Sequence, residues 1–224
     1  MASLPLSSIP LLFLLLIPSI TADPDALQDF CVADTKSSTT FFNGLPCLNP
    51  SEVTGKHFTT SVLNKPANTS GNPFLYGVTI TSPQALPGIN TMGIALARVD
   101  VEKGGQVPPH THPRADEYVY IMEGTFNGGF VDSNNNYYSQ TVKAGDVFVF
   151  PRGTIHFLQN IHDGHGYMLA GFNSQNPGLA VTSLQTFASN PAVPPHILAQ
   201  AFQISEKDVR KIRKKLGGSG GYGK

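Results

Sequence analysis

Three side chains that commonly bind metal ions stand close together in the stretch HTHPRADE, residues 110–117. His110 and His112 are two residues apart, and in a strand this spacing directs both side chains to the same face. Glu117 follows His112 by five residues, which is the wrong parity for one unbroken strand. Pro113 cannot donate a ladder hydrogen bond, so we expect a turn or bulge there that returns Glu117 to the same interior face as the next strand begins.

A fourth candidate ligand, His156, lies in FPRGTIHFLQN, where a Pro-Gly turn precedes a short apolar strand. Three imidazoles and one carboxylate form a ligand set without thiolate. In an octahedral site this set leaves two positions for water or substrate, which suits manganese or iron and leaves zinc open. An isolated His-x-His pair also occurs by chance at surfaces, but the added glutamate and the second motif favour a metal. We therefore predict a manganese site with four ligands: His110, His112, Glu117 and His156.

The other histidines lack such a setting. His162 and His165 have ligand-like spacing in HDGHG, but this stretch is typical of a turn, so we expect both to face solvent. His57 and His196 have no companions and are expected to be structural or exposed. No G-x-S-x-G nucleophile motif is present, and EKGGQ lacks the Lys-Ser/Thr of a phosphate-binding loop.

Composition limits the class of protein. The chain has 224 residues, which favours one domain, and its 15 basic and 15 acidic residues cancel. No net field therefore attracts nucleic acid or an anionic membrane, and we expect no nucleic-acid partner. The 22 glycines and 18 prolines are scattered among short apolar runs, which favours many strands and turns.

The first 22 residues have the pattern of a cleaved signal peptide, with an apolar run around residues 11–17 and small residues up to Ala22. The segment has no Lys or Arg, and the alternatives are a membrane anchor or a core strand. A membrane span needs about 20 apolar residues, and no later segment supplies them. We expect a secreted, extracellular protein.

Export changes the interpretation of Cys31 and Cys47, because thiols form disulfides in oxidising compartments. Only one pairing is possible, and the alternative is two unpaired thiols. Closing a loop of about 15 residues would stabilise the fold by roughly 3 kcal/mol. Asn68 begins an Asn-Thr-Ser sequon in a polar, turn-rich stretch, which predicts a glycosylated loop.

The chain organisation follows from apolar patterning. A Cys-bracketed arm at 23–49 leads through a turn-rich link into a predicted barrel of about 55–190. From Met92 onward, alternating runs such as EYVYIMEG, DVFVFPRG and GYMLAGFN are typical of an all-β sandwich or barrel. Two helices are expected at about 194–216, the second beginning with Ser205 and Asp208 as a capping box. Its basic face could contact anionic wall polymers or lipids, or be merely solvated. Residues 217–224 are expected to form a flexible tail.

These motifs resemble those of the germin and germin-like proteins, a plant branch of the cupin superfamily. GGQVPPHTHPRADEYVYIMEG resembles the first germin box, GDVFVFPRGTIHFLQN the second, and DPDALQDFCVAD the mature N-terminus of the family. The resemblance covers residues 23 to about 216. It implies a cupin jelly-roll β-barrel with C-terminal α-helices and manganese held by the four ligands above. It also implies a Cys31–Cys47 disulfide and an apoplastic cell-wall glycoprotein that forms a homo-oligomer, usually a hexamer built as a trimer of dimers.

One departure from the family concerns substrate. Oxalate-oxidising germins carry asparagines that hold oxalate at positions matching Ala97 and Val107 of this chain. Neither side chain can donate a hydrogen bond to a dianion, so we expect no oxalate oxidase activity.

Three functions follow from the resemblance. The first is a manganese enzyme that dismutates superoxide to hydrogen peroxide, with roles in defence or wall modification. The second is a non-enzymatic binding, receptor-like or storage cupin. The third is a sugar-nucleotide pyrophosphatase or phosphodiesterase, for which Arg114 would bind phosphate. We expect Arg114 instead to form a surface or subunit-contact ion pair.

Overall fold

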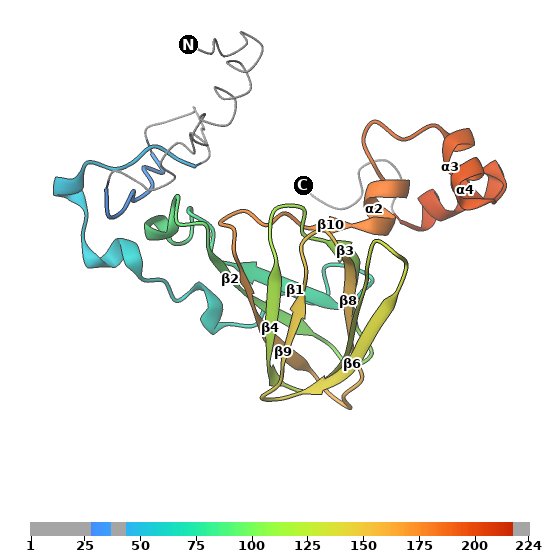
Figure 1. Cartoon of the computed structure of the whole chain (residues 1–224), viewed down its shortest axis with the longest axis horizontal. Helices are drawn as coiled ribbons and strands as arrows, with labels where there is room; N and C mark the ends of the chain where they lie inside the picture. The colour runs from blue at the N-terminus through green and yellow to red at the C-terminus, as the bar shows by residue number, and fades with distance from the viewer. Residues whose placement is uncertain (1–27, 37–43, 217–224) are drawn as a thin grey trace, which may run out of the picture.

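The computed structural model describes residues 28–36 and 44–216, and the strands of this part of the chain form two facing antiparallel sheets (Figure 1). The first sheet has, in spatial order, β1 (Tyr76–Ile80), β2 (Ala95–Val101), β9 (Gly166–Phe172), β4 (Glu117–Glu123) and β7 (Val147–Phe150). The second has, in spatial order, β10 (Ala180–Val181), β3 (Gln106–Thr111), β8 (Ile155–Asn160), β5 (Thr125–Val131) and β6 (Tyr137–Lys143). The predicted signal peptide and tail lie outside the described residues, as do 23–27 and 37–43 of the predicted arm.

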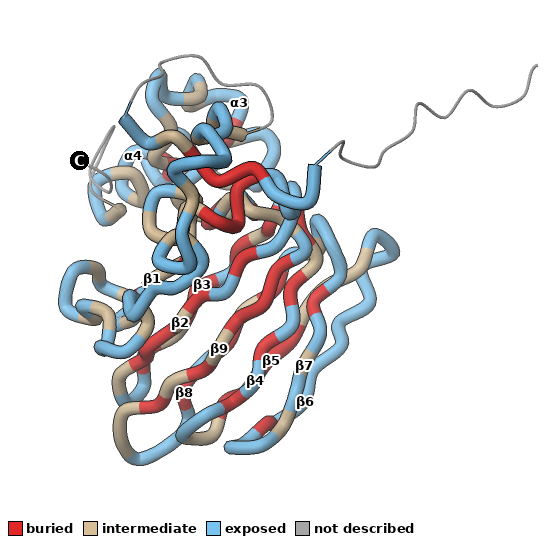
Figure 2. Tube along the Cα trace, turned by 90° about the vertical axis from the view of Figure 1, so that its left-hand side faces the viewer, coloured by how far each residue is buried: buried red, intermediate tan, exposed pale blue. Residues whose placement is uncertain are grey.

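Side chains alternate along these strands between the buried interior of the barrel and its surface. In β4, Val119 and Ile121 are fully buried while Tyr118 and Tyr120 point outward. The turns between strands use residues suited to a positive φ, such as Gly145 (φ 95°) between β6 and β7. Figure 2 shows the buried positions recurring along the strands.

Side chains from both sheets fill the space between them. Each large apolar side chain that becomes fully buried stabilises the fold by about 1.5–3 kcal/mol. The fully buried side chains include Ile121, Phe126, Phe150, Leu158 and Met168. The predicted all-β jelly-roll with C-terminal helices is confirmed.

The structure contains elements that the apolar runs do not reveal. Strand β1 lies in a stretch for which no element was predicted, and β10 has only two residues. The short helix α2 (Thr182–Phe187) follows β10 directly. The described residues also form 3-10 turns outside the barrel strands: η2 (Pro50–Glu52), η3 (Gly55–Phe58), η4 (Val62–Asn64) and η5 (Pro87–Ile89).

The C-terminal helices project from one end of the barrel (Figure 1). Helices α3 (Pro195–Phe202) and α4 (Glu206–Lys215) pack around Leu198 and Val209, with Ile212 and Leu216 against the cluster. Ser205 accepts a hydrogen bond from the Asp208 amide at 3.2 Å, as a helix N-cap should. Among the described residues, no helix has the length and apolar character to cross a bilayer.

Candidate metal centre

The four predicted ligands meet inside the barrel. His110 comes from β3, His112 follows β3 directly, Glu117 begins β4, and His156 lies in β8. All four are buried, and their ligand atoms lie within 4.8 Å of one another. The structure therefore brings together four side chains that span 47 positions, from 110 to 156, of the chain.

Strand pairing places these side chains. In the antiparallel ladder of β3 and β8, His110 lies opposite His156, after a register shift between Val107 and His110. Glu117 comes from the facing sheet, because the chain crosses from β3 to β4 through a turn that includes Pro113. The turn predicted at Pro113 is confirmed, and it works by moving the chain to the other sheet.

Backbone carbonyls orient the three imidazoles. The Nδ1 atom of His110 lies 2.8 Å from the Pro108 carbonyl oxygen, and that of His156 lies 2.8 Å from the Thr154 carbonyl oxygen. His112 Nδ1 contacts the carbonyl oxygen of Gly178. A carbonyl oxygen can only accept, so each Nδ1 must carry the proton. With Nδ1 bonded to a carbonyl, Nε2 is the nitrogen of each ring that is left to bind a metal ion.

The Nε2 atoms and the carboxylate converge on one point. Nε2 of His110 and Nε2 of His112 are 3.2 Å apart, and Glu117 Oε2 lies 3.2 Å from His112 Nε2 and 3.0 Å from His156 Nε2. Lone pairs facing one another at these distances repel unless a cation, either a proton or a metal ion, lies among them. The donor set fits a metal ion, with backbone carbonyls behind the ligands as is usual at metal sites.

The pKa values of His110 and Glu117 favour the forms that bind a metal ion. Burial, together with the neighbouring His156, lowers the pKa of the His110 imidazole to about 3. Burial acts in the opposite direction on Glu117, but its contacts with His112 and His156 outweigh burial and lower its pKa to about 2. At neutral pH, the neutral His110 and the ionised Glu117 are therefore ready to act as ligands.

Two phenylalanines fix the ring positions. Phe150 stacks on His156, with ring centroids 4.5 Å apart and an interplanar angle of 17°. Phe172 meets His112 edge to face at 4.8 Å. Both rings belong to β7 and β9 of the facing sheet, so packing between the sheets holds the imidazoles in place.

A cavity of about 350 Å³ opens beside the four ligands. Ala97 and Val107, the two positions where oxalate-oxidising relatives are expected to carry asparagine, both line it and are buried. Arg114 lines a separate polar pocket instead. Its guanidinium donates to the carbonyl and side-chain oxygens of Asn176, at 2.6 and 2.9 Å, instead of pairing with a carboxylate of the described residues.

The remaining histidines lie outside the centre. His162 and His196 are exposed, and His57 Nδ1 accepts from the Thr54 amide at 3.0 Å, as expected. His165 differs from the prediction, because its Nε2 lies 3.2 Å from Asp100, a carboxylate that is buried beside Arg98. Sequence reasoning missed this cluster because Asp100 faces outward on β2 and is covered by the linker around Ala67, whose amide donates to it at 2.8 Å.

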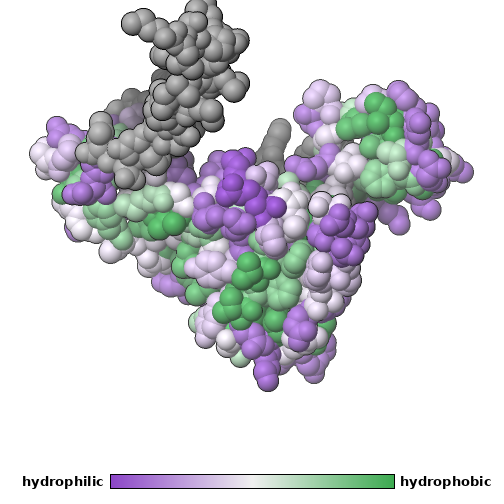
Figure 3. All heavy atoms as spheres, in the orientation of Figure 1, coloured by the Kyte–Doolittle hydropathy of each residue, from purple (hydrophilic) through white to green (hydrophobic). Residues whose placement is uncertain are grey.

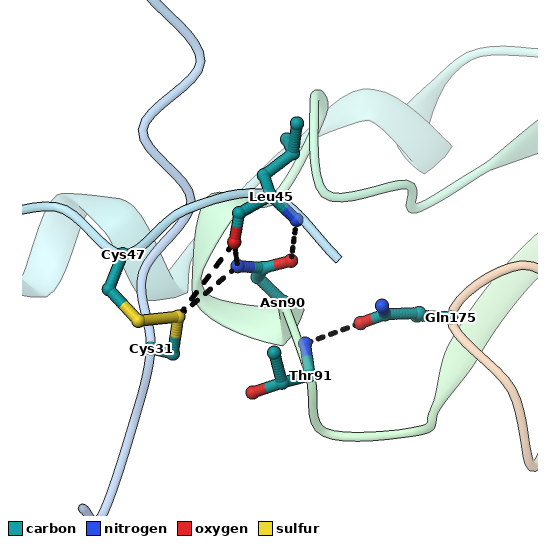
Figure 4. Close-up of a disulfide and its surroundings, with 6 residues drawn as sticks. All are labelled: Cys31, Leu45, Cys47, Asn90, Thr91 and Gln175. Atoms are coloured by element: carbon teal, nitrogen blue, oxygen red, sulfur yellow. Dashed lines mark hydrogen bonds between the residues drawn. A yellow bond between two sulfur atoms is a disulfide. The ribbon is translucent and has the colours of Figure 1, made fainter. Parts of the chain in front are cut away.

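The disulfide between Cys31 and Cys47 is present in the structure (Figure 4). Buried Asn90 docks the arm onto the barrel, since it donates to the Leu45 carbonyl at 2.7 Å and accepts from the Leu45 amide at 3.0 Å.

Asn68, the sequon asparagine, is exposed, and its side-chain oxygen accepts from Ser70 Oγ at 2.8 Å. This position is accessible to glycosylation.

Comparisons with known proteins identify the family. The cupin family profile matches residues 61–210. Germin-like protein subfamily 1 member 1 of Arabidopsis thaliana is 42% identical over 91% of this chain and 95% of the relative. Germin-like protein subfamily 2 member 1 of the same plant is 46% identical over 88% of this chain and 90% of the relative. The chain is a germin-like cupin.

The fold of this germin-like chain also matches solved structures. An oxalate oxidase in complex with the substrate analogue glycolate is 41% identical, with a TM-score of 0.83, over 88% of this chain and all of that one. The germin-family resemblance inferred from the two boxes is confirmed.

Proposed function

We propose that this germin-like chain is a secreted manganese-binding protein that dismutates superoxide. The observation that carries the proposal is the convergence of three Nε2 lone pairs and one carboxylate beside a cavity. Imidazole and carboxylate ligands without thiolate suit manganese, which keeps open positions in an octahedral site. When bound, manganese supplies a one-electron couple that can both oxidise and reduce superoxide.

The residues of the chain hold the centre and limit what reaches it. Pro108, Thr154 and Gly178 fix the imidazoles through their carbonyls, while Glu117 supplies one negative charge. Two superoxide anions and two protons give one dioxygen and one hydrogen peroxide, so the reaction consumes two protons that solvent can supply. Extracellular peroxide would suit a role in defence or wall modification.

We propose further that oxalate is not the substrate. The structural relatives named as oxalate oxidases are 40–41% identical, so the fold alone does not decide the activity. Ala97 and Val107 support the proposal, since both line the cavity and neither can hydrogen-bond to a dianion. Arg114, which a phosphate-transfer activity would need, is bonded to Asn176.

The disulfide and the germin-like relatives support an extracellular location in the apoplast or cell wall. A homo-oligomer, proposed as a hexamer built from dimers, would cover apolar side chains that the isolated chain exposes. Figure 3 shows such side chains gathered on the barrel near β4 and on the C-terminal helices. Those on β4 and β7 are Tyr118, Tyr120, Met122, Val147 and Val149.

The test is one purified sample of the secreted protein, assayed for bound metals, superoxide dismutation and oxalate oxidation. We expect manganese and dismutation. The variant His110→Ala/His112→Ala should lose both, whereas His162→Ala, at an exposed histidine, should retain both. Undiminished turnover by metal-free protein would exclude the enzyme proposal, and metal without turnover above that of free manganese would favour the non-enzymatic cupin. Robust oxalate turnover would overturn the substrate proposal.

A further inference from the structure

Most of the cavity beside the metal centre is walled by hydrocarbon. Only one side of it carries ligands, namely His110, His112 and Glu117. The other polar side chains lining it are Ser82, Gln175 and Asn176. The remaining lining is mainly apolar and includes Val78, Ile80, Leu158 and Leu179.

The cavity is larger and more apolar than the small anion superoxide requires. Its volume of about 350 Å³ lies within the range of sites for small organic molecules, and superoxide would fill a small part of it. No Lys or Arg is found among its described lining residues, so an anion would meet no basic side chain there. Away from the candidate metal ligands a buried charge would have no partner, whereas apolar surface gains from burial.

The cavity reaches solvent along β1. Tyr76 and Ile80 pack against the barrel core, and Val78 shares their face of the strand. Val78 is nevertheless 42% exposed. An interior-facing side chain with this exposure marks an opening, and Leu179 is likewise exposed in the segment that lines the cavity after β9. A molecule can therefore enter between β1 and this segment.

We propose that the cavity binds an uncharged organic molecule with a hydrocarbon body and one hydroxyl group, such as a simple phenol. Its hydroxyl faces His110, His112 and Glu117, and its body lies against the wall formed by Val78, Ile80 and Leu158. The proposal rests on the proposed function only in placing a metal at the hydroxyl end. It accounts for the apolar wall, which superoxide dismutation does not need.

The experiment is calorimetric titration of the purified, metal-loaded protein with 4-ethylphenol and with tyramine. These two probes share a phenol and differ in a terminal ammonium group, which would be buried against hydrocarbon. We expect saturable binding of one 4-ethylphenol per chain, with tyramine about tenfold weaker or more, because the unpaired charge is costly to desolvate.

A matched pair of variants locates the site. Val78→Asp places a charge at the cavity opening and should weaken 4-ethylphenol binding about tenfold or more. Val62→Asp makes the same change at a valine that is 37% exposed and does not line the cavity, and it should bind like the parent protein. Absence of saturable binding, equal binding of the two probes, or equal weakening by both variants would overturn the proposal.

Metal content and superoxide dismutation, measured on the same sample, separate this inference from the proposed function. Active, manganese-loaded protein that does not bind 4-ethylphenol refutes the inference alone. Protein that binds 4-ethylphenol with the expected variant pattern but does not dismutate superoxide refutes the proposed activity and supports the inferred site.

Discussion

Gly178 lies in the loop after β9, and the backbone conformation of this loop determines how His112 is oriented. Its carbonyl oxygen receives the Nδ1 proton of His112, and its φ is 74°. A β-carbon at this position would lie 2.9 Å from the Arg114 guanidinium and 3.2 Å from Pro113. A larger residue would therefore strain the backbone and shift the carbonyl that orients the imidazole.

Gly178→Ala should reduce manganese affinity about tenfold or more, because losing a partner behind a ligand has effects of this size. It should also lower the free energy of unfolding of the metal-free protein by about 1–2 kcal/mol through the positive φ. Competitive metal titration and urea unfolding measure the two effects.

Gly104→Ala is the matched control. Gly104 lies in the turn between β2 and β3 and has a φ of 70°, but nothing lies within 4 Å of its added β-carbon. We expect a similar loss of stability with no change in metal affinity. If both variants lose the same affinity, the Gly178 carbonyl has no special part in holding His112.

At the scale of elements, the N-terminal arm is attached to the barrel by a few specific contacts. The disulfide closes the arm upon itself, and Asn90, in the segment after η5, binds Leu45 through both of its amide atoms (Figure 4). The next residue, Thr91, donates its amide to the side chain of Gln175, which lines the cavity. The four candidate metal ligands belong to β3, β4, β8 and the turn after β3.

Replacing both Cys31 and Cys47 by serine should lower the free energy of unfolding by about 3 kcal/mol, the value for a closed loop of about 15 residues. Bound manganese per chain should stay unchanged, because the ligands lie on barrel strands and a turn between them. Urea unfolding followed by circular dichroism and metal analysis of the folded protein test this. Reduced parent protein provides the control, and loss of metal in either case would show that the arm supports the centre.

At the scale of the whole molecule, the outer face of the first sheet is unusually apolar for a surface. Val149 is 58% exposed on β7, and Tyr118 and Tyr120 lie on the neighbouring strand β4. Contiguous apolar surface of this kind marks contact with another protein surface. In the proposed oligomer a second copy covers it.

Val149→Asp should therefore lower the molar mass in solution, because the contact would bury an unpaired carboxylate on each chain. Sedimentation velocity measures the change. Ile161→Asp is the control, since Ile161 is 51% exposed in the loop after β8 and outside this face. A parent protein that sediments as a monomer, or equal effects of both variants, would contradict the proposed contact.

The strands with strong alternation were predictable because their patterns are local. Val119 and Ile121 alternate with tyrosines in β4. An alternating pattern of this kind can be recognised in the sequence without knowing which strand pairs with it. The cluster of candidate metal ligands was predictable for a related reason. His110, His112 and Glu117 are close in sequence, and His156 lies in a second motif of the germin boxes.

The cavity and the outer-face cluster were not predictable in this way. Strand β1 has a glycine in its second position and mixed burial, so its apolar pattern is weak, yet Val78 and Ile80 form a wall of the cavity. Asp100 lies outward on β2, and only the linker folded over it makes it a buried partner for Arg98 and His165.

The sequence by itself determined the ligand types, the family and the strand-rich class, because these depend on residue identity and short-range periodicity. Tertiary structure alone decided that Glu117 reaches the histidines from the opposite sheet. It also decided that carbonyls of Pro108, Thr154 and Gly178 set the imidazole tautomers. Such contacts depend on how separate strands are placed in space, and neither periodicity nor composition records that placement.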